Sequence, residues 1–177
     1  LFVDGPDAQP NRRAGYALLN APRVAPAYDI GNAERIVALD SDFLTQGPDH
    51  LAHAAGFARG RAPERGDTMN RLYAIEPHFT ATGMAADNRF QLAASQIGEF
   101  AKALAGRVLA GGTVPDWAQA VQTKLTGTSS AANFERWVNA VAADLLAHRG
   151  RSVVVVGERQ PAWVHAVGVI INDALGA

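Results

Sequence analysis

Three short apolar runs stand out from the pattern of hydrophobic and polar positions along the chain. They cover residues 35–40, 71–76 and 152–156, and none alternates strictly between apolar and polar positions. A strand with one solvated face alternates, whereas a strand that is buried on both faces is apolar almost throughout, as in parallel sheets. The runs therefore predict three central strands of a parallel sheet that is covered on both sides.

Between and after these runs, apolar residues recur at the spacing typical of helices. The segments concerned are residues 47–60, 97–108, 115–125, 134–145 and 161–175. Gly47-Pro48-Asp49 supplies the start of the first helix, because Pro is tolerated in a first turn and the helix dipole favours Asp there. A short additional strand is expected around Phe90 and Leu92.

The order of these elements indicates the fold class. Strand, helix, strand, helices, strand and helix is the pattern of an open doubly wound sheet with right-handed crossovers. We therefore predict an α/β, Rossmann-like three-layer sandwich with a mainly parallel sheet, formed by residues 35–177. Residues 1–34 hold several of the nine prolines and are expected to form an irregular N-terminal arm, with at most a short helix around residues 16–19.

Composition narrows the classes of function. A chain of 177 residues that is 48% apolar and 19% charged is long and apolar enough to fold around one core. Its net charge of -1 provides no long-range field to attract nucleic acid or anionic lipid, so no nucleic-acid partner is expected. The absence of cysteine excludes a thiolate nucleophile and cysteine-held zinc or iron–sulfur sites in this segment.

The chain also carries signs of being part of a larger protein. It begins with Leu rather than Met and ends within a helical pattern at Leu175. No stretch approaches the roughly 20 apolar residues that span a bilayer. We expect a soluble fragment of a longer chain.

Polar residues follow each predicted strand where the carboxyl ends of parallel strands should meet. Asp40 and Asp42 follow the first strand, Glu76 follows the second, and Gly157 and Glu158 follow the last. In doubly wound sheets, ligands bind at this edge. These five residues are the candidate cofactor-binding site.

Two interpretations of this edge remain open. In a nucleotide-binding site, Gly157 would let a phosphate approach a helix start, and Glu76 would accept hydrogen bonds from ribose hydroxyls. In a vestigial or purely structural edge, the residues would bind nothing. The second interpretation is favoured because the chain has no Gly-x-Gly-x-x-Gly or Walker motif, and because Asp40, Asp42 and Glu158 would repel a pyrophosphate.

Other candidate chemistry is weaker. His50 and His53 could face one metal ion from a helix, but no third ligand accompanies them. Ser152 precedes a strand, and the pair Ser129-Ser130 is expected to open a helix, so neither forms a nucleophile elbow between a strand and a helix. We expect no catalytic residue and no metal ligand in this segment.

Three segments carry a resemblance to a known family. Residues 28–44, which begin Tyr28-Asp-Ile-Gly-Asn, look like the start of a cofactor-type domain in molybdopterin oxidoreductases. Residues 69–89 and 150–161 resemble, more narrowly, the large iron–sulfur subunit of alternative complex III. The resemblance covers roughly residues 24–175. In that family, a molybdopterin-oxidoreductase-like region is joined to a ferredoxin-like cluster-binding region on a membrane quinol-oxidising assembly.

The chain departs from the catalytic relatives at two places. Where they have an Asp-Pro-Arg-like turn, this chain has Glu76-Pro77-His78, and after Ala86-Asp87 an Ala-Ala-Ser-Gln sequence replaces the usual Pro-Gly-Thr-Asp loop. Both changes weaken binding of a pterin nucleotide. The subunit type that the chain resembles keeps the fold without a molybdenum cofactor in this region.

The resemblance implies a scaffold and docking domain, without its own cofactor, in an electron-transport complex of the oxidoreductase class. The implied partners are the remaining domains of the parent chain, including the ferredoxin-like iron–sulfur region, and the membrane quinol-oxidising subunits. The parent would be exported and membrane-associated on the periplasmic side, and could carry iron–sulfur clusters. The alternatives are a domain that binds a molybdopterin guanine dinucleotide in a molybdenum oxidoreductase, and an independent nucleotide-binding regulatory module.

Overall fold

The computed structural model describes residues 9–19, 27–62, 64, 69–111 and 134–177. Helices and strands alternate along these ranges in the order α1 (Pro10–Leu18), β1 (Arg35–Leu39), α2 (His50–Arg59), β2 (Arg71–Glu76), α3 (Ala81–Ala85), β3 (Asn88–Gln91), α4 (Ala94–Ala110), α6 (Glu135–Ala147), β4 (Ser152–Val156) and α7 (Ala162–Leu175). The helix expected over residues 115–125 and the serine pair at 129–130 lie outside the described residues.

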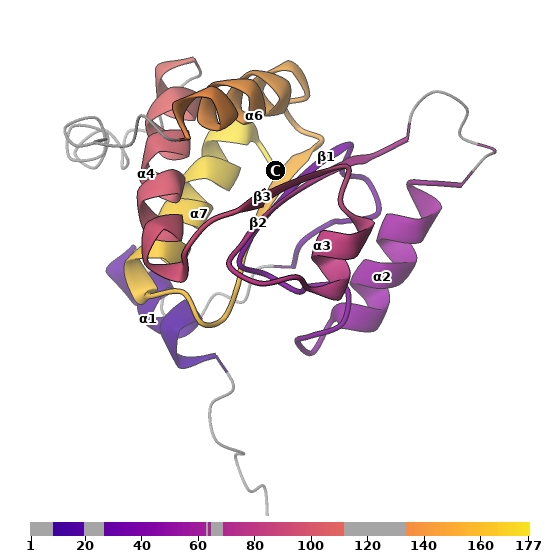
Figure 1. The fold of residues 1–177 in the computed structure, drawn as a ribbon, viewed down its shortest axis with the longest axis horizontal. Coiled ribbons are helices and arrows are strands. Elements are labelled where there is room, and N and C mark those ends of the chain that lie inside the picture. Colours follow the sequence, from indigo (N-terminus) through magenta and orange to yellow (C-terminus); the bar gives the residue numbers. More distant parts are fainter. Residues whose placement is uncertain (1–8, 20–26, 63, 65–68, 112–133) are drawn as a thin grey trace, which may run out of the picture.

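The four strands form one parallel sheet in the order β3-β2-β1-β4 (Figure 1). Ile36 of β1 lies between Leu72 of β2 and Val153 of β4, and the register continues to the end of β1. The α/β, Rossmann-like fold and the three strands expected from the apolar runs are confirmed, as is the short strand at Phe90. One expectation is wrong: β4 is not a central strand but one edge of the described sheet.

A side chain closes the outer edge of β4. Asn172 of α7 accepts a hydrogen bond from the backbone N–H of Val154 at 2.7 Å and donates one to the carbonyl oxygen of Val154 at 2.9 Å. The side-chain amide therefore makes the two hydrogen bonds that the backbone of a neighbouring strand would make with this residue. An unpaired strand edge invites pairing with other chains. Its closure explains how a strand buried along its whole length can lie at an edge.

Side chains of the strands alternate between two cores, one on each face of the sheet. Val37 and Leu39 of β1 face the larger core, which they share with α4, α6 and α7, whereas Ile36 and Ala38 face a smaller core that contains Phe57 of α2. Figure 1 shows these helices on opposite sides of the sheet, with α3 beside α2. Burying one large aliphatic side chain in such a core contributes about 1.5–3 kcal/mol.

The N-terminal arm is not wholly irregular. Helix α1 begins at Pro10 rather than near Tyr16 and packs against α7. A Cβ atom on Gly15 would lie only 2.5 Å from the carbonyl oxygen of Ala162 and 2.7 Å from the Cβ of His165, so glycine is what permits this close approach. The start of α2 also differs from expectation: the helix begins at His50, so Pro48 precedes it instead of occupying its first turn.

Candidate functional site

The chain direction across the sheet changes between β1 and β4. From β1 the chain proceeds to β2 and β3 on one side, and then returns to place β4 on the other side of β1. Such a switch point opens a crevice at the carboxyl ends of the two strands, where doubly wound proteins bind their ligands. Here the crevice lies between the loop after Leu39 and the loop after Val156.

A cavity of about 220 Å³ occupies this crevice. Its walls come from the loop after β1, the loop after β4 and helix α1, and include Asp40, Asp42, Gly157 and Glu158. Pockets for small organic ligands and cofactors are usually about 300–1,000 Å³. The cavity is therefore smaller than a dinucleotide requires.

Asp40 is held inside the chain. Its side chain accepts a hydrogen bond at 2.9 Å from Nε2 of Gln160, and Asp40 is only 8% exposed. Its φ of 51° lies in the left-handed region, which Asp tolerates better than most residues. A Cβ atom on Gly157 would lie 1.7 Å from the carbonyl oxygen of Asp40, so Gly157 allows the two loops to pack against each other.

The carboxylate oxygens of Asp42 also accept hydrogen bonds from within the chain. Oδ1 accepts the backbone N–H of Thr82 at 2.9 Å, and Oδ2 accepts the hydroxyl of Thr45. Burial alone would raise the pKa of Asp42, but the hydrogen bonds from Thr45 and Thr82 outweigh it and hold the pKa below its usual value. The carboxylate thus ties the loop after β1 to α3.

Glu76 lies apart from the crevice. It is 3% exposed and accepts hydrogen bonds from the hydroxyl of Thr80 at 2.6 Å and from Nε of Arg89 at 2.5 Å. Thr80 is the N-cap of α3 and accepts the backbone N–H of Gly83 at 3.0 Å. Glu76 therefore anchors the start of α3 and does not line the cavity.

Glu158 is exposed and contacts the start of α1. Nε2 of Gln9 donates to its carboxylate, and Nδ2 of Asn11 lies 3.4 Å from its backbone carbonyl oxygen. The structure thus brings four of the five predicted residues to one crevice, namely Asp40, Asp42, Gly157 and Glu158. Each predicted carboxylate, including that of Glu76, accepts a hydrogen bond from a donor within the chain.

The charge around the cavity is unfavourable for a phosphate. Four carboxylates line it, from Asp40, Asp42, Asp49 and Glu158, against two guanidinium groups, from Arg12 and Arg159. This is an excess of two negative charges with histidine neutral. A pyrophosphate would meet net repulsion there.

The two helical histidines do not converge on one point. Nδ1 of His50 lies 2.8 Å from the carbonyl oxygen of Gly47, and the ring of His53 contacts the rings of Tyr28 and Phe43. Burial lowers the pKa of His53. Within the described residues, no three His, Cys, Asp or Glu side chains are arranged to hold a metal ion.

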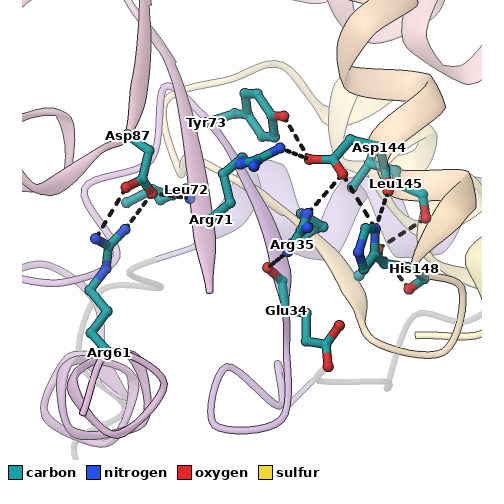
Figure 2. Close-up of polar contacts among 11 residues, drawn as sticks. Glu34, Arg35, Arg61, Arg71, Leu72, Tyr73, Asp87, Asp144, Leu145 and His148 are labelled. Atoms are coloured by element: carbon teal, nitrogen blue, oxygen red, sulfur yellow. Dashed lines mark hydrogen bonds and ion pairs between the residues drawn. The ribbon is translucent and has the colours of Figure 1, made fainter. Parts of the chain in front are cut away.

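A second polar centre, not expected from the sequence, lies at the opposite, amino edge of the sheet (Figure 2). Asp144 of α6 is 14% exposed and accepts hydrogen bonds from Nε of Arg35 at 2.8 Å, from Arg71 at 2.9 Å and from the hydroxyl of Tyr73 at 2.7 Å. Arg35 and Arg71 are the first residues of β1 and β2. One carboxylate therefore joins α6 to two neighbouring strands.

The end of α6 completes this centre. Nδ1 of His148 lies 2.7 Å from the carbonyl oxygen of Asp144 and 3.3 Å from its Oδ1, and because both atoms are acceptors, Nδ1 carries the proton. The hydroxyl of Ser152, which opens β4, donates to the carbonyl oxygens of Leu145 and His148. The last carbonyl groups of the helix thus find donors on the sheet.

Electrostatics show that the Asp144 centre is satisfied in its charged form. Burial raises the pKa of Asp144, but the hydrogen bonds from Arg35 and Tyr73 and the charges of Arg35 and Arg71 outweigh burial and leave the pKa below its usual value. Burial, together with the hydrogen bond to Asp144, raises the pKa of Tyr73. The centre therefore stays ionised at neutral pH and acts as a clamp.

A smaller clamp lies beside it. Arg61, which follows α2, pairs with both carboxylate oxygens of Asp87, and Asp87 accepts the backbone N–H of Leu72 at 2.8 Å (Figure 2). This contact ties the end of α2 to β2 and to the start of β3. The two clamps hold helices from opposite faces of the sheet.

Comparison with known proteins does not add to this picture. The chain matches no protein-family model and no curated protein. In the part of the chain that the structure describes, no helix has the length and apolar character needed to cross a membrane.

Proposed function

We propose that the chain is a scaffold and docking domain of a molybdopterin-oxidoreductase-like iron–sulfur subunit, and that it works without a cofactor of its own. The parent would belong to a membrane-associated, quinol-oxidising electron-transfer complex. The resemblance in residues 28–44, 69–89 and 150–161 supports this assignment, because these segments contain β1, β2 and β4, the start of β3, and residues of the loops that form the crevice.

The cofactor-free part of the proposal rests on the hydrogen bonds that the predicted carboxylates already accept. Asp40, Asp42, Glu76 and Glu158 each accept hydrogen bonds from donors within the chain. Glu76 lies outside the cavity, so a cofactor in the crevice would compete for the other three carboxylates. Breaking the bond between Gln160 and the buried Asp40 would leave a buried polar atom unpaired, at about 1–3 kcal/mol. The small volume and negative charge of the cavity act in the same direction.

On this proposal, the domain acts through its surfaces. Its partners are the remaining domains of the parent chain, with a ferredoxin-like region that carries iron–sulfur clusters, and the quinol-oxidising subunits in the membrane. The parent is exported and acts on the periplasmic side. A rigid domain suits this role, and the clamps at Asp144 and Asp87 join α6 and the end of α2 to the sheet.

The switch-point crevice favours a second candidate function. A domain that binds a molybdopterin guanine dinucleotide would use this position, with Gly157 near the phosphates and Arg12 and Arg159 as cations. Binding would require α1 to withdraw Gln9 from Glu158 and to enlarge the cavity. An independent nucleotide-binding regulatory module would need the same change.

Purification of the parent from its own membranes tests the proposal. An affinity tag on the parent chain, after mild detergent extraction, should recover quinol-oxidising subunits and iron–sulfur signals in electron paramagnetic resonance spectra, without molybdenum in elemental analysis. Untagged membranes serve as the control for carry-over. Recovery of one molybdenum per chain with a guanine-containing pterin would favour the second candidate, and recovery of the chain alone would contradict the docking role.

A further inference from the structure

Helix α1 occupies one side of the switch-point crevice. Gln9 and Arg12 form part of the cavity wall, and Gln9 and Asn11 bind Glu158 at the end of β4. In an open doubly wound sheet this side of the crevice would be available to a ligand. The helix therefore stands where a ligand would enter.

Helix α1 packs against α7 but buries few of its own residues. Gly15 and Tyr16 are the buried residues of the helix, and its large apolar residue Leu18 is 62% exposed. Gly15 fits against the start of α7, where any side chain would strike Ala162 and His165. Tyr16 is thus the one large side chain that α1 buries.

The surface of α7 beneath α1 includes a buried polar side chain. His165 is 2% exposed, and its Nε2 has no hydrogen-bond partner within the described residues. Burial, followed by the nearby charge of Arg12, lowers the pKa of His165 to about 4, and burial raises the pKa values of Tyr16 and Tyr28. An interface of this kind gains less from the hydrophobic effect than the cores on the two faces of the sheet.

We infer that α1 is a built-in lid of the switch-point crevice, which closes the crevice by its own contacts and opens as a unit while the sheet stays folded. Segments that make few buried apolar contacts open with less free energy than the core of the same protein. In the closed state Gln9 and Arg12 take the place of a ligand, and the open state exposes the buried part of the loop after β1. This inference does not depend on the parent complex, so its failure would leave the proposed function intact.

A single introduced thiol can report the opening, because the chain has no cysteine. Ser41 lines the cavity and is 9% exposed, so Ser41→Cys places a small reactive group inside the crevice. We expect its reaction with a thiol reagent to accelerate at least about tenfold when Gly15→Leu detaches α1, since reactivity follows access. Ala14→Leu adds the same side chain to an exposed position of α1 and should leave the rate within about twofold.

Hydrogen exchange on the unmodified chain provides the second measurement, which holds even if the Gly15→Leu chain does not fold. The amides of α1 should exchange faster than those of β1 and β4 under native conditions. An unchanged thiol reaction rate in a folded Gly15→Leu chain would overturn the lid. Equal protection of α1 and β1 would overturn it too, because the helix would then open only with the whole domain.

Discussion

Asp144 shows how one side chain can organise one edge of this molecule. Its carboxylate accepts hydrogen bonds from two guanidinium groups and a phenol. The carbonyl groups at the end of its helix accept hydrogen bonds from His148 and Ser152. A carboxylate that is 14% exposed is stable only with such compensation. Removal of its charge should therefore lower the stability of the whole domain.

Replacement of Asp144 by Asn tests this residue. Asp144→Asn leaves the largely buried guanidinium of Arg35 without its counter-ion, and the free energy of unfolding at pH 7 should fall by about 3 kcal/mol. The control is Glu135→Gln, which breaks the exposed pair with Arg107 and should cost less than about 0.5 kcal/mol.

The effect of Asp144→Asn should depend on pH in a defined direction. The pKa of Asp144 is lower in the folded than in the unfolded chain, so its contribution is complete above the unfolded pKa of about 3.9 and is lost as pH falls through the folded pKa. In urea unfolding, the free energies of unfolding of the unmodified chain and of the variant should therefore converge below about pH 4. A difference that stays constant from pH 7 to pH 3 would contradict the charged clamp.

The sequence around Asp144 does not reveal the role of this residue. It lies on the polar side of a helical pattern, where a charge ordinarily faces water, and its partners Arg35 and Arg71 come 109 and 73 residues earlier. No local spacing rule connects such residues. One signal is available: two buried parallel strands both begin with arginine, and cations at the same end of neighbouring strands require an acid nearby.

At the scale of elements, β1, β2 and β4 were predictable because each carries its own apolar run. The place of β4 in the sheet was not, because strand order depends on crossovers and on Asn172, whose pairing with Val154 is visible only in three dimensions. The same limit applies to the site. The meeting of Asp40, Asp42 and Glu158 follows from parallel strands, whereas the donors that satisfy them come from distant segments.

The contact between the loops after β1 and β4 is set by a glycine. Gly157→Ala would bring a methyl group within 1.7 Å of the backbone oxygen of Asp40, which cannot move without shifting a strand end. We expect thermal and urea unfolding to show a loss of about 2–3 kcal/mol. Gly31→Ala is the matched control, because its nearest neighbour is the flexible end of Arg59 at 3.0 Å. Equal effects of the two changes would refute the close packing of the loops.

At the scale of the whole molecule, the two edges of the sheet differ in what they could do. The amino edge carries the clamps at Asp144 and Asp87, which join helices of both faces to the strands. The carboxyl edge holds the crevice, and its carboxylates are satisfied by the chain itself while α1 covers one side. These features support the proposal that the molecule keeps an α/β, Rossmann-like architecture without binding a nucleotide at this edge.

Titration calorimetry of the chain with guanine nucleotides and with a molybdopterin guanine dinucleotide tests this central claim most directly. At moderate salt, the account predicts no heat of binding up to millimolar ligand, and no rise in the unfolding temperature, since a ligand that binds the folded state would stabilise it by mass action. One-to-one binding in the low micromolar range, with a matching rise in unfolding temperature, would contradict the account and establish the crevice as a cofactor site.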